Sequence, residues 1–359
     1  MEFIENFFSG APTYLTAIYF VVGLVLIIKG GDWFVDAASW IAETLGVPKF
    51  VIGATIVSIA TTLPEMIVSI AATIKGNVDM AAGNAIGSVT ANTAMIMGVF
   101  IVCMPFVVKR KEFTPKALLM FGASAALVLG CIFTAKQTLT FEGETQDYYS
   151  LSIIGTIVLF VIFAVFFIEN FISMKNSDRQ ITTTTESIAI TFDDEVTTEK
   201  ASAKEWVKYI LLFLLGAGGT VIGAEILVNS GTTLAQEIHV PQRIISVFAV
   251  AIGTSLPELV TTITALRKKE GALSVGNILG ANIIDLTLIL PICSFISMNN
   301  NGGALAVSAS SVTVDMVVCL AAIAIAIFPT IATKKFHRWQ GILMLAGYVG
   351  YIIVTVVLK

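Results

Sequence analysis

Two short motifs occur twice in this chain, and the second copy follows the first at an offset of 193 positions (258 − 65 = 193). Residues 60–65 read Ala-Thr-Thr-Leu-Pro-Glu and residues 253–258 read Gly-Thr-Ser-Leu-Pro-Glu. Residues 83–92 read Gly-Asn-Ala-Ile-Gly-Ser-Val-Thr-Ala-Asn, and residues 276–285 read Gly-Asn-Ile-Leu-Gly-Ala-Asn-Ile-Ile-Asp. Each copy places an acid and a proline inside an apolar stretch, where a charge is costly. A repeat of this kind is typical of secondary transporters.

The composition indicates a protein that crosses a membrane many times. Hydrophobic residues make up 56% of the 359 positions and charged residues only 13%, against roughly 25% charged residues in soluble domains. We therefore expect an all-α membrane protein with spans of about 20 residues each. Ten spans are predicted, at residues 13–43, 48–75, 79–107, 115–135, 150–173, 205–238, 241–267, 272–297, 311–331 and 337–358.

A polar segment divides the chain into two halves of five predicted helices each. Residues 1–174 form the first half, with its repeated region at 53–98, and residues 205–359 form the second, with its repeated region at 246–291. Residues 175–204 between them are rich in Thr, Ser and acidic residues. This segment is predicted to be a soluble connector, with a regulatory role as the alternative.

Basic residues predict the orientation of the spans. With ten spans, most basic residues that lie near helix ends fall on one face, and this face is expected to be cytoplasmic. Both termini then lie outside, as in a prokaryotic inner membrane. Because each half has an odd number of helices, the second half enters the membrane from the opposite side. The halves are thus predicted to be inverted repeats, an architecture that supports alternating access. The residues of the cytoplasmic face are Lys109, Arg110, Lys111, Lys116, Lys175, Arg179, Lys200, Lys204, Lys208, Arg267, Lys268, Lys269, Lys334, Lys335 and Arg338.

The first motif carries groups that bind hard cations. Proline inside a helix leaves a backbone carbonyl without its donor, so Pro64 and Pro257 are expected to break their helices and to free the carbonyls of Ala60 and Gly253. In the first copy, two threonine hydroxyls precede the acid by four and three residues, on its helix face. Carbonyl, hydroxyl and carboxylate oxygens favour Ca²⁺, Na⁺ or Mg²⁺ over soft metals.

The second motif predicts a polar stripe on a neighbouring helix. Asn84, Ser88 and Asn92 recur every four residues, and their equivalents are Asn277, Ala281 and Asp285. Asn84 and Asn277 are either cation ligands or hydrogen-bonding groups between helices. The glycines of both copies have the G-x-x-x-G spacing that allows helices to approach closely.

The charge of the motifs calls for bound cations. Glu65, Glu258 and Asp285 would carry three negative charges if all were ionised, and no Lys or Arg lies within the motifs. Such a cluster is unfavourable in a low-dielectric interior unless cations offset it. Competition of Ca²⁺ and Na⁺ for the same carboxylates is the physical basis of an antiporter.

At these residues the chain resembles the cation/Ca²⁺ exchanger superfamily, and within it the small prokaryotic Na⁺/Ca²⁺ exchangers. The resemblance implies that Glu65 and Glu258 bind Ca²⁺ together with the backbone carbonyls of Thr61 and Thr254. It also implies flanking Na⁺ sites, formed by Thr62, Ser88, Asn92, Ser255 and Asp285.

The chain departs from the family pattern at several positions of the two copies. Ala60 and Thr62 replace Gly and Ser, and Val89 replaces Asn. Ala281 replaces a serine that would offer a hydroxyl to Na⁺, which puts one Na⁺ site in question. The H⁺/Ca²⁺ branch has a glutamate where this chain has Gly87 and Gly280, which disfavours proton coupling.

The leading hypothesis is an antiporter that exchanges Ca²⁺ for Na⁺, and two alternatives concern the coupling ion. These are H⁺-coupled cation antiport and K⁺-dependent Na⁺/Ca²⁺ exchange. A channel or sensor is a weaker class, and no nucleophile–base constellation indicates an enzyme. Partners are then the transported ions and lipid, without cofactor or nucleic acid. Outside the motifs, Asp32 and Glu225 occupy equivalent positions of the copies and are candidates to line the pathway.

Overall fold

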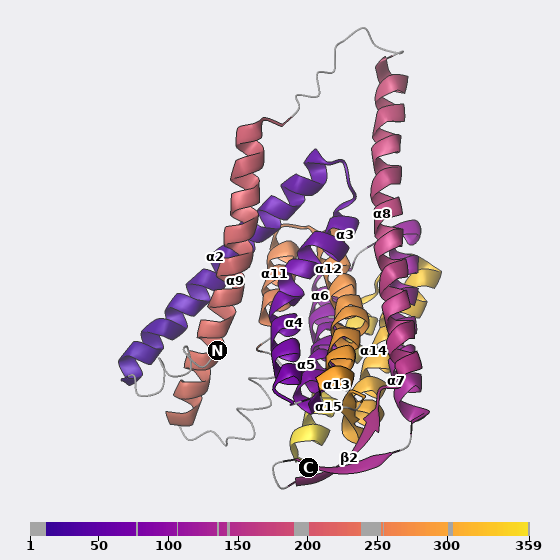
Figure 1. The fold of residues 1–359 in the computed structure, drawn as a ribbon. Helices are drawn as coiled ribbons and strands as arrows, with labels where there is room; N and C mark the ends of the chain where they lie inside the picture. Colours follow the sequence, from indigo (N-terminus) through magenta and orange to yellow (C-terminus); the bar gives the residue numbers. More distant parts are fainter. Residues whose placement is uncertain are drawn as a thin grey trace.

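The computed structural model describes residues 12–76, 78–105, 107–134, 136–141, 144–189, 201–237, 253, 255–300 and 304–357. Most helices stand side by side in one bundle, and two long helices, α2 and α9, lie together along one side of it (Figure 1). We call the end of the bundle at residues 189 and 201 the linker end, and the opposite end the sheet end. Within the described residues, eight helical segments are long and apolar enough to cross a membrane.

The elements of the first half follow the predicted spans closely. The predicted and observed ends of each span agree within a few residues, with two exceptions. Helix α7 begins five residues before the expected 115, and α8 continues well beyond 173. The helix α8 therefore enters the segment predicted to be a connector, whose residues 190–200 lie outside the described part. The elements are α2 (Thr13–Thr44), α3 (Lys49–Ile52), η1 (Gly53–Val57), α4 (Ser58–Ile74), α5 (Val78–Thr90), η2 (Ala91–Met97), α6 (Gly98–Cys103), α7 (Arg110–Ile132) and α8 (Ile153–Ala189).

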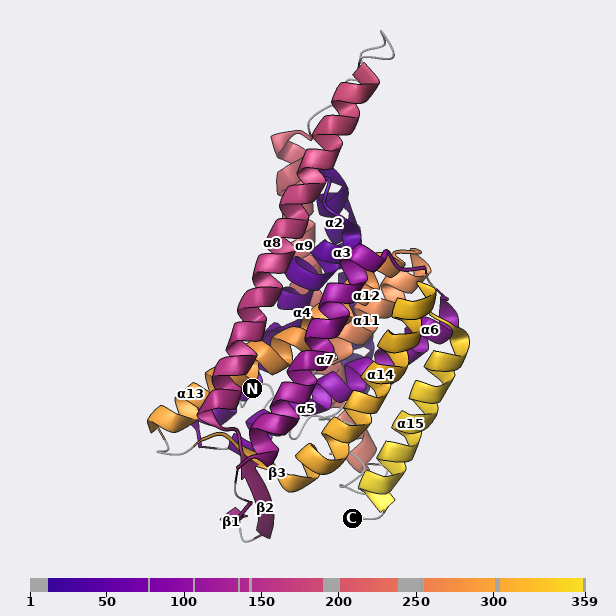
Figure 2. The same cartoon turned by 90° about the vertical axis from the view of Figure 1, so that its right-hand side faces the viewer.

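The second half shows the same succession of helices where it is described. The span predicted at 241–267 is represented by its last twelve residues, in α11, and its residues 241–252 and 254 lie outside the described part. Figure 2 shows α14 and α15 together on the face that is turned away from α2 and α9. The elements are α9 (Ala203–Glu237), α11 (Leu256–Arg267), α12 (Gly271–Ile284), η3 (Asp285–Ile289), α13 (Leu290–Asn300), η4 (Ser311–Asp315), α14 (Met316–Thr333) and α15 (Arg338–Val357).

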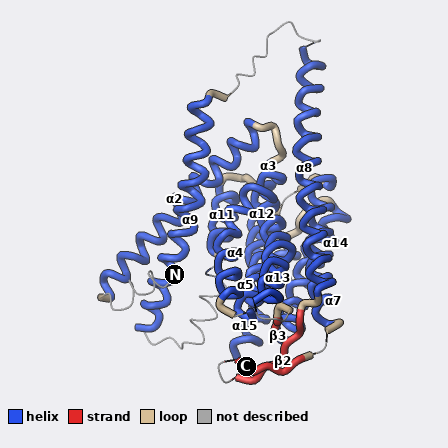
Figure 3. The backbone as a smooth tube through the Cα atoms, in the orientation of Figure 1, coloured by secondary structure: helices blue, strands red, loops and turns tan. Residues whose placement is uncertain are grey.

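A small antiparallel sheet makes the all-α prediction wrong in one place. Strands β1 (Gln137–Phe141), β2 (Glu144–Ser150) and β3 (Ala306–Ser308) pair in the order β1-β2-β3, and Figure 3 shows them at one end of the bundle. Threonine and tyrosine, which favour strands, are frequent in β1 and β2, and the hairpin lies beyond the apolar spans. The third strand of the sheet, β3, comes from the other half of the chain, so the sheet connects the two halves.

The helices α2 and α9 pack backbone against backbone through glycines. A Cβ at Gly30 would lie 2.6 Å from the Thr220 nitrogen, and one at Gly223 would lie 2.7 Å from the Ile27 nitrogen. These contacts are equivalent, because adding 193 to the α2 residue and subtracting it from the α9 residue turns one into the other. The contacts of Gly23 with Leu227 and of Gly216 with Phe34 are related in the same way. The pair is therefore antiparallel and nearly two-fold symmetric, as in an isologous interface.

Helix α12 lies in the middle of the bundle, where its glycines meet the first half. A Cβ at Gly276 would lie 2.1 Å from the Phe50 carbonyl oxygen, and one at Gly280 would lie 2.5 Å from that of Ala54. The predicted close approach is thus confirmed for this copy. For Gly83 and Gly87, no described atom lies within 4 Å of such a Cβ. The offset predicts that Gly83 and Gly87 would meet residues 243 and 247, the equivalents of Phe50 and Ala54, and these lie outside the described part.

Candidate functional site

The two repeated glutamates are buried inside the bundle on different helices. Glu65 on α4 is 0% exposed and Glu258 on α11 is 1% exposed, and Asp285 at the start of η3 is also fully buried. The Glu65 carboxylate interacts electrostatically with those of Glu258 and Asp285. The fold therefore brings together the three acids of the repeated motifs, although they come from both halves of the chain.

The two prolines occupy different local structures. Pro64 lies inside α4, which is helical without interruption from Ser58 to Ile74. Pro257 lies in the first turn of α11, which begins at Leu256, a place where the missing N–H of proline is harmless. The expected interruption at proline thus corresponds to a helix start in the second copy, whereas α4 accommodates Pro64 within a continuous helix. Thr254 lies outside the described residues.

A hydrogen-bonded chain links the two copies at Glu65. The Ser88 hydroxyl on α5 donates to Glu65 Oε1 at 3.3 Å, and it lies 2.8 Å from the Ser255 hydroxyl. Ser255 is the last residue before α11 and therefore belongs to the second copy of the first motif. The two serines and Glu65 are members of the predicted site, and they meet across the halves at one point.

The counterpart of this serine pair lacks one hydroxyl. The offset relates Ser88 to Ala281 and Ser255 to Thr62. The Thr62 hydroxyl donates to the Ser58 carbonyl of its own helix at 2.6 Å, as a helical threonine does without a better partner. The replacement of serine by Ala281 therefore makes the two flanks of the site chemically different.

Asn84 and Asn277, which occupy equivalent positions of the two copies, also differ in their contacts. The Asn84 side-chain amide donates to the Glu65 carbonyl at 3.3 Å and to the Ser69 hydroxyl at 3.0 Å. The Thr61 hydroxyl is 3.2 Å from Asn277 Oδ1, to which it donates. Asn84 thus braces α4 against α5 through its amide group, and Asn277 connects α12 with the first motif.

Many polar atoms around the acids are buried without a hydrogen-bond partner among the described residues. The group includes both oxygens of two acids and one oxygen of the third, and unpartnered oxygens are unfavourable inside a protein. Hard cations such as Na⁺ and Ca²⁺ take oxygen ligands, so the oxygen atoms of this set are suited to bind such cations. The atoms are Glu65 Oε2, Glu258 Oε1 and Oε2, Asp285 Oδ1 and Oδ2, Asn92 Oδ1 and Nδ2, Asn277 Nδ2 and Thr262 Oγ1.

Acidic side chains alone do not build a coordination shell here. Within the part of the chain that the structure describes, no three His, Cys, Asp or Glu side chains are placed closely enough to hold a metal ion together. A cation at this site would therefore need the hydroxyl, amide and backbone oxygens near the acids. Calcium commonly uses such mixed oxygen sets.

The polar stripes run into π-helical turns at equivalent places. The segment η2 covers Ala91–Met97 and η3 covers Asp285–Ile289, so Asn92 and Asp285 lie at the same position of the two copies. A π turn shifts the following side chains round the helix and is frequent at functional sites. The i, i+4 spacing of the stripes did not predict these turns.

Two more buried hydroxyls belong to the region and were missed in the sequence. Ser69 accepts a hydrogen bond from Asn84, and the Thr262 hydroxyl has no partner among the described residues. The same offset relates them, so the repeat itself contained the signal. The remaining candidates, Ala60 and Gly253, are half-buried, and a Cβ at Gly253 would lie 3.4 Å from the Val228 side chain.

A cavity of about 260 Å³ lies next to both prolines. It is on the sheet-end side of the acids, because Ile67 and Val68, which follow Pro64 in α4, form part of its wall. Helix α9 contributes Glu225 and Asn229 to the opposite wall. The cavity therefore lies between α4, α9 and the start of α11, beside the proline of each first motif.

Comparison with known proteins assigns the chain to a family. The family described as sodium/calcium exchanger protein matches residues 15–170 and 208–357, which together hold both motifs and all three buried acids. The chain belongs to this family. It is 30% identical over 336 residues to an uncharacterised membrane protein of Methanocaldococcus jannaschii, covering 92% of this chain and 95% of that protein.

Members of the sodium/calcium exchanger family with a named activity are also similar along nearly their whole length. The sodium/calcium exchanger MaX1 of Methanosarcina acetivorans is 29% identical over 355 residues, covering 93% of this chain and 96% of MaX1. The solved structure of the sodium-calcium exchanger NCX_Mj matches with a TM-score of 0.74 and 27% identity, covering 97% of this chain and 100% of that one. The fold described above is therefore that of a sodium/calcium exchanger.

Proposed function

We propose that this protein is a secondary-active antiporter that exchanges Ca²⁺ for Na⁺ across a membrane. The observation that carries the proposal is a buried set of three acids from both halves of the chain, Glu65, Glu258 and Asp285, whose oxygens include five without a partner among the described residues. The motifs contain no basic residue to offset the three acids, so bound cations are favoured. Two kinds of cation that compete for the same acids favour coupled transport. The names of MaX1 and NCX_Mj support the same ion pair.

Alternating access in this protein would use two inverted repeats of five helices. The near two-fold contact of α2 with α9 supports this architecture, because it relates residues at the same offset as the motifs. The equivalent π turns at Asn92 and Asp285 support it as well. Two similar halves of opposite orientation can adopt two related conformations, each open to one side of the membrane.

The proposed ligands fall into a central and a flanking set. Glu65 and Glu258 with the carbonyls of Thr61 and Thr254 would hold Ca²⁺, and the remaining polar residues would hold Na⁺ at the flanks. The contact between Ser88 and Ser255 beside Glu65 supports a flanking position there. The flanking residues are Thr62, Ser88, Asn92, Ser255 and Asp285, and Ala60, Gly253, Asn84 and Asn277 are further contributors.

The orientation follows from the charges at the two ends of the bundle. Basic residues after α11 and in α7 lie toward the linker end, which would face the cytoplasm of a prokaryotic cell. Residues 12 and 357 lie at the other end of their helices, so both termini would be outside. In this orientation the cavity beside the prolines lies on the outward side of the acids, and the inward Na⁺ gradient would drive Ca²⁺ out of the cell.

The decisive experiment is ion flux into liposomes that contain the purified protein. Vesicles loaded with Na⁺ and diluted into Na⁺-free buffer should take up ⁴⁵Ca²⁺, and Glu65→Gln and Glu258→Gln should each abolish this uptake. Glu205→Gln, which neutralises an exposed acid at the start of α9, is the matched control and should retain it. Wild-type vesicles without Na⁺-driven uptake would refute the proposal.

The same vesicles separate the two alternative coupling ions. Uptake driven by a pH gradient in the absence of Na⁺ would assign the protein to H⁺-coupled antiport, and a requirement for K⁺ inside the vesicles would assign it to K⁺-dependent exchange. With pH and K⁺ equal on both sides, we expect uptake to depend on the Na⁺ gradient alone.

A further inference from the structure

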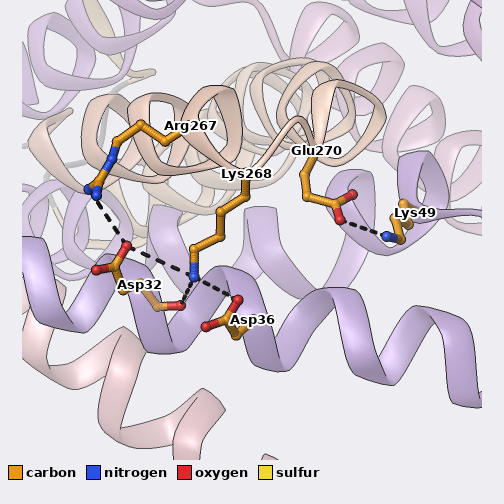
Figure 4. A network of polar contacts seen from close by, with 6 residues as sticks. All are labelled: Asp32, Asp36, Lys49, Arg267, Lys268 and Glu270. Atoms are coloured by element: carbon orange, nitrogen blue, oxygen red, sulfur yellow. Dashed lines mark hydrogen bonds and ion pairs between the residues drawn. The ribbon is translucent and has the colours of Figure 1, made fainter.

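A network of ion pairs fastens α2 to the end of α11 at the linker end (Figure 4). Lys268 Nζ lies 2.6 Å from Asp36 Oδ1 and 3.9 Å from Asp32 Oδ1, and it donates to the Asp32 carbonyl at 2.9 Å. Arg267 Nη1 lies 3.8 Å from Asp32 Oδ1. We call these four residues the linker-end latch. It holds α2, and with it the α2–α9 pair, against the helices that carry the acids.

The repeat offset identifies a second acid and base that correspond to this latch. Asp32 corresponds to Glu225 (32 + 193 = 225), and Lys268 corresponds to Lys75 (268 − 193 = 75). Asp32 and Lys268 connect α2 to α11, so Glu225 and Lys75 are the equivalent pair on α9 and α4. Asp32 and Glu225 are equivalent in the sequence, and the structure shows that Asp32 has basic partners.

The second pair is not formed in the structure. Glu225 is half-buried in the wall of the cavity beside the prolines, and Lys75 is exposed at the C-cap of α4. Among the described residues, no ion pair joins either of them to another side chain. Lys75 follows the cavity residue Val68 by seven positions, or roughly 10 Å along the helix. The ion pairs of the latch are therefore formed at the linker end, whereas the equivalent pair is not formed on the side of the sheet end, where the cavity lies.

The α2–α9 pair is suited to move as one body between these two contacts. Glycine contacts lock its helices together at the backbone, as with Gly30 against Thr220 and Gly216 against Phe34. Its contacts with the bundle are apolar side-chain packing, as around Phe34 and Ala265, and the exposed and half-exposed ion pairs of the latch, which are individually weak. A shift of about one helical turn, roughly 5 Å, is known for such transitions, and a shift of α9 toward the sheet end would carry Glu225 toward Lys75.

We propose that Glu225 and Lys75 are positioning residues that form an ion pair when the sheet end closes, while Asp32 and Lys268 separate. This inference rests on the alternating access of the proposed function. Each pair then stabilises one of the two end states, and exchange requires that one pair breaks before the other forms. The two pairs act on the transport site only through the position of the α2–α9 unit.

The two contacts contain different numbers of charged residues. Asp36 corresponds to Asn229 and Arg267 corresponds to Ile74, so the linker-end latch has two acids and two bases whereas the sheet-end pair has one of each. The stronger latch belongs to the state described here. The protein without ions should therefore rest with its linker end closed and its cavity accessible from the sheet end.

The test measures how accessible the cavity is, using Val68→Cys as a reporter in a Cys103→Ser background. Cys103 is the exposed one of the four native cysteines, and the other three are buried. The rate of modification by a water-soluble maleimide reports the population with an open sheet end. Purified full-length protein in proteoliposomes is used, and wild-type Na⁺-driven Ca²⁺ uptake is measured on the same preparation.

The proposal predicts opposite effects for the two pairs. Glu225→Gln and Lys75→Met remove a contact of the closed sheet end and should raise the modification rate, by less than about twofold because the open state is already favoured. Asp32→Asn and Lys268→Met remove a contact of the open state and should lower the rate about two- to fivefold. The exchanged pair Glu225→Lys with Lys75→Glu should return the rate to that of the reporter protein, and Glu205→Gln should leave it unchanged.

Two outcomes would overturn the proposal. One is an unchanged rate in Glu225→Gln and Lys75→Met, and the other is a change in the same direction in all four single variants, as general loosening would produce. Failure of the exchanged pair to restore the rate would also refute it. Because the modification rate needs no transport, a wild type without Na⁺-driven uptake would refute the proposed function separately.

Discussion

The hydroxyl oxygens of Ser88 and Ser255 lie 2.8 Å apart, although 167 residues separate them in the chain. Ser88 also donates to Glu65, so this contact joins the carboxylate of one half to the first motif of the other. The equivalent place, between Thr62 and Ala281, has only one hydroxyl, and Thr62 turns back to its own helix. The two flanks of the site therefore differ in the number of oxygen ligands they can offer.

Restoring the missing hydroxyl should strengthen Na⁺ binding. Ala281→Ser places a hydroxyl opposite Thr62, and we expect the Na⁺ concentration for half-maximal Ca²⁺ exchange to fall about threefold, because one added hydrogen-bonding or ligating group contributes on the order of 1 kcal/mol. Ser88→Ala should shift this concentration upward. The Ca²⁺ concentration for half-maximal binding, measured in the absence of Na⁺, should change less in both variants. Equal changes for the two ions would contradict the assignment of these positions to Na⁺.

Glycine substitutions test the contact between α2 and α9. A Cβ at Gly216 would lie 2.5 Å from the Phe34 nitrogen, so Gly216→Ala must push the helices apart. We expect the free energy of unfolding to fall by about 1–3 kcal/mol, seen as a lower thermal midpoint in detergent. Gly218→Ala is the matched control on the same helix, since no described atom lies within 4 Å of its Cβ. It should be neutral or stabilising through its helix propensity. Equal loss in both variants would argue against the close contact.

The bundle was predictable because apolar length reports membrane spans directly. The first predicted span, 13–43, differs from α2 by one residue at its end. The sheet was not predictable, because β3 pairs with a strand that lies more than 150 residues earlier, and no local pattern encodes such pairing. The strands β1 and β2 are also short and polar, so they resemble a loop between two spans.

For the candidate site too, local sequence predicted some residues, and the contacts between distant segments required the structure. The offset in sequence was sufficient to find Glu65, Glu258 and Asp285, since a buried acid in an apolar span has few structural explanations. The partners of those acids depend on how α4, α5 and α11 cross in space. For that reason the Ser88–Ser255 contact and the return of Thr62 to Ser58 emerge only from the structure. Which oxygens ligate each ion stays a prediction.

Lys116 illustrates how a charge in the sequence can be misplaced. Its position after a predicted span assigned it to the cytoplasmic surface, but α7 begins at Arg110 and encloses it. The side chain is 0% exposed, donates to Glu169 on α8 and lies 5.5 Å from the centre of the Phe50 ring. Pro115 lies in the second turn of α7, and the helix accommodates it although its N–H is missing.

Breaking this buried pair should destabilise the protein strongly. Lys116→Met leaves the Glu169 carboxylate without its cation, and we expect a loss of about 3 kcal/mol in the free energy of unfolding. The double variant Lys116→Met with Glu169→Gln removes both charges and should recover most of that loss. Thermal unfolding followed by tryptophan fluorescence measures both. A double variant no more stable than the single one would show that the packing of Lys116, rather than its charge, matters.

Ion binding should stabilise the protein through the buried acids, independently of transport. Glu65, Glu258 and Asp285 are buried near one another and repel when ionised, so a bound cation stabilises their ionised form in the folded state. At a free Ca²⁺ concentration roughly 100 times the dissociation constant, the stabilisation should reach about 2.7 kcal/mol, visible as a higher thermal midpoint. Na⁺ should produce a rise as well, at higher concentration.

The neutral variants of the same acids identify where this stabilisation arises. Glu65→Gln and Glu258→Gln reduce the repulsion and remove a ligand, so each should be at least as stable as the wild type without ions and should lose the rise with Ca²⁺. Glu205→Gln keeps all three acids and should behave as the wild type. If the two buried variants were still stabilised by Ca²⁺ as much as the wild type, the cation would have to bind elsewhere, and the assignment of these acids as ligands would be wrong.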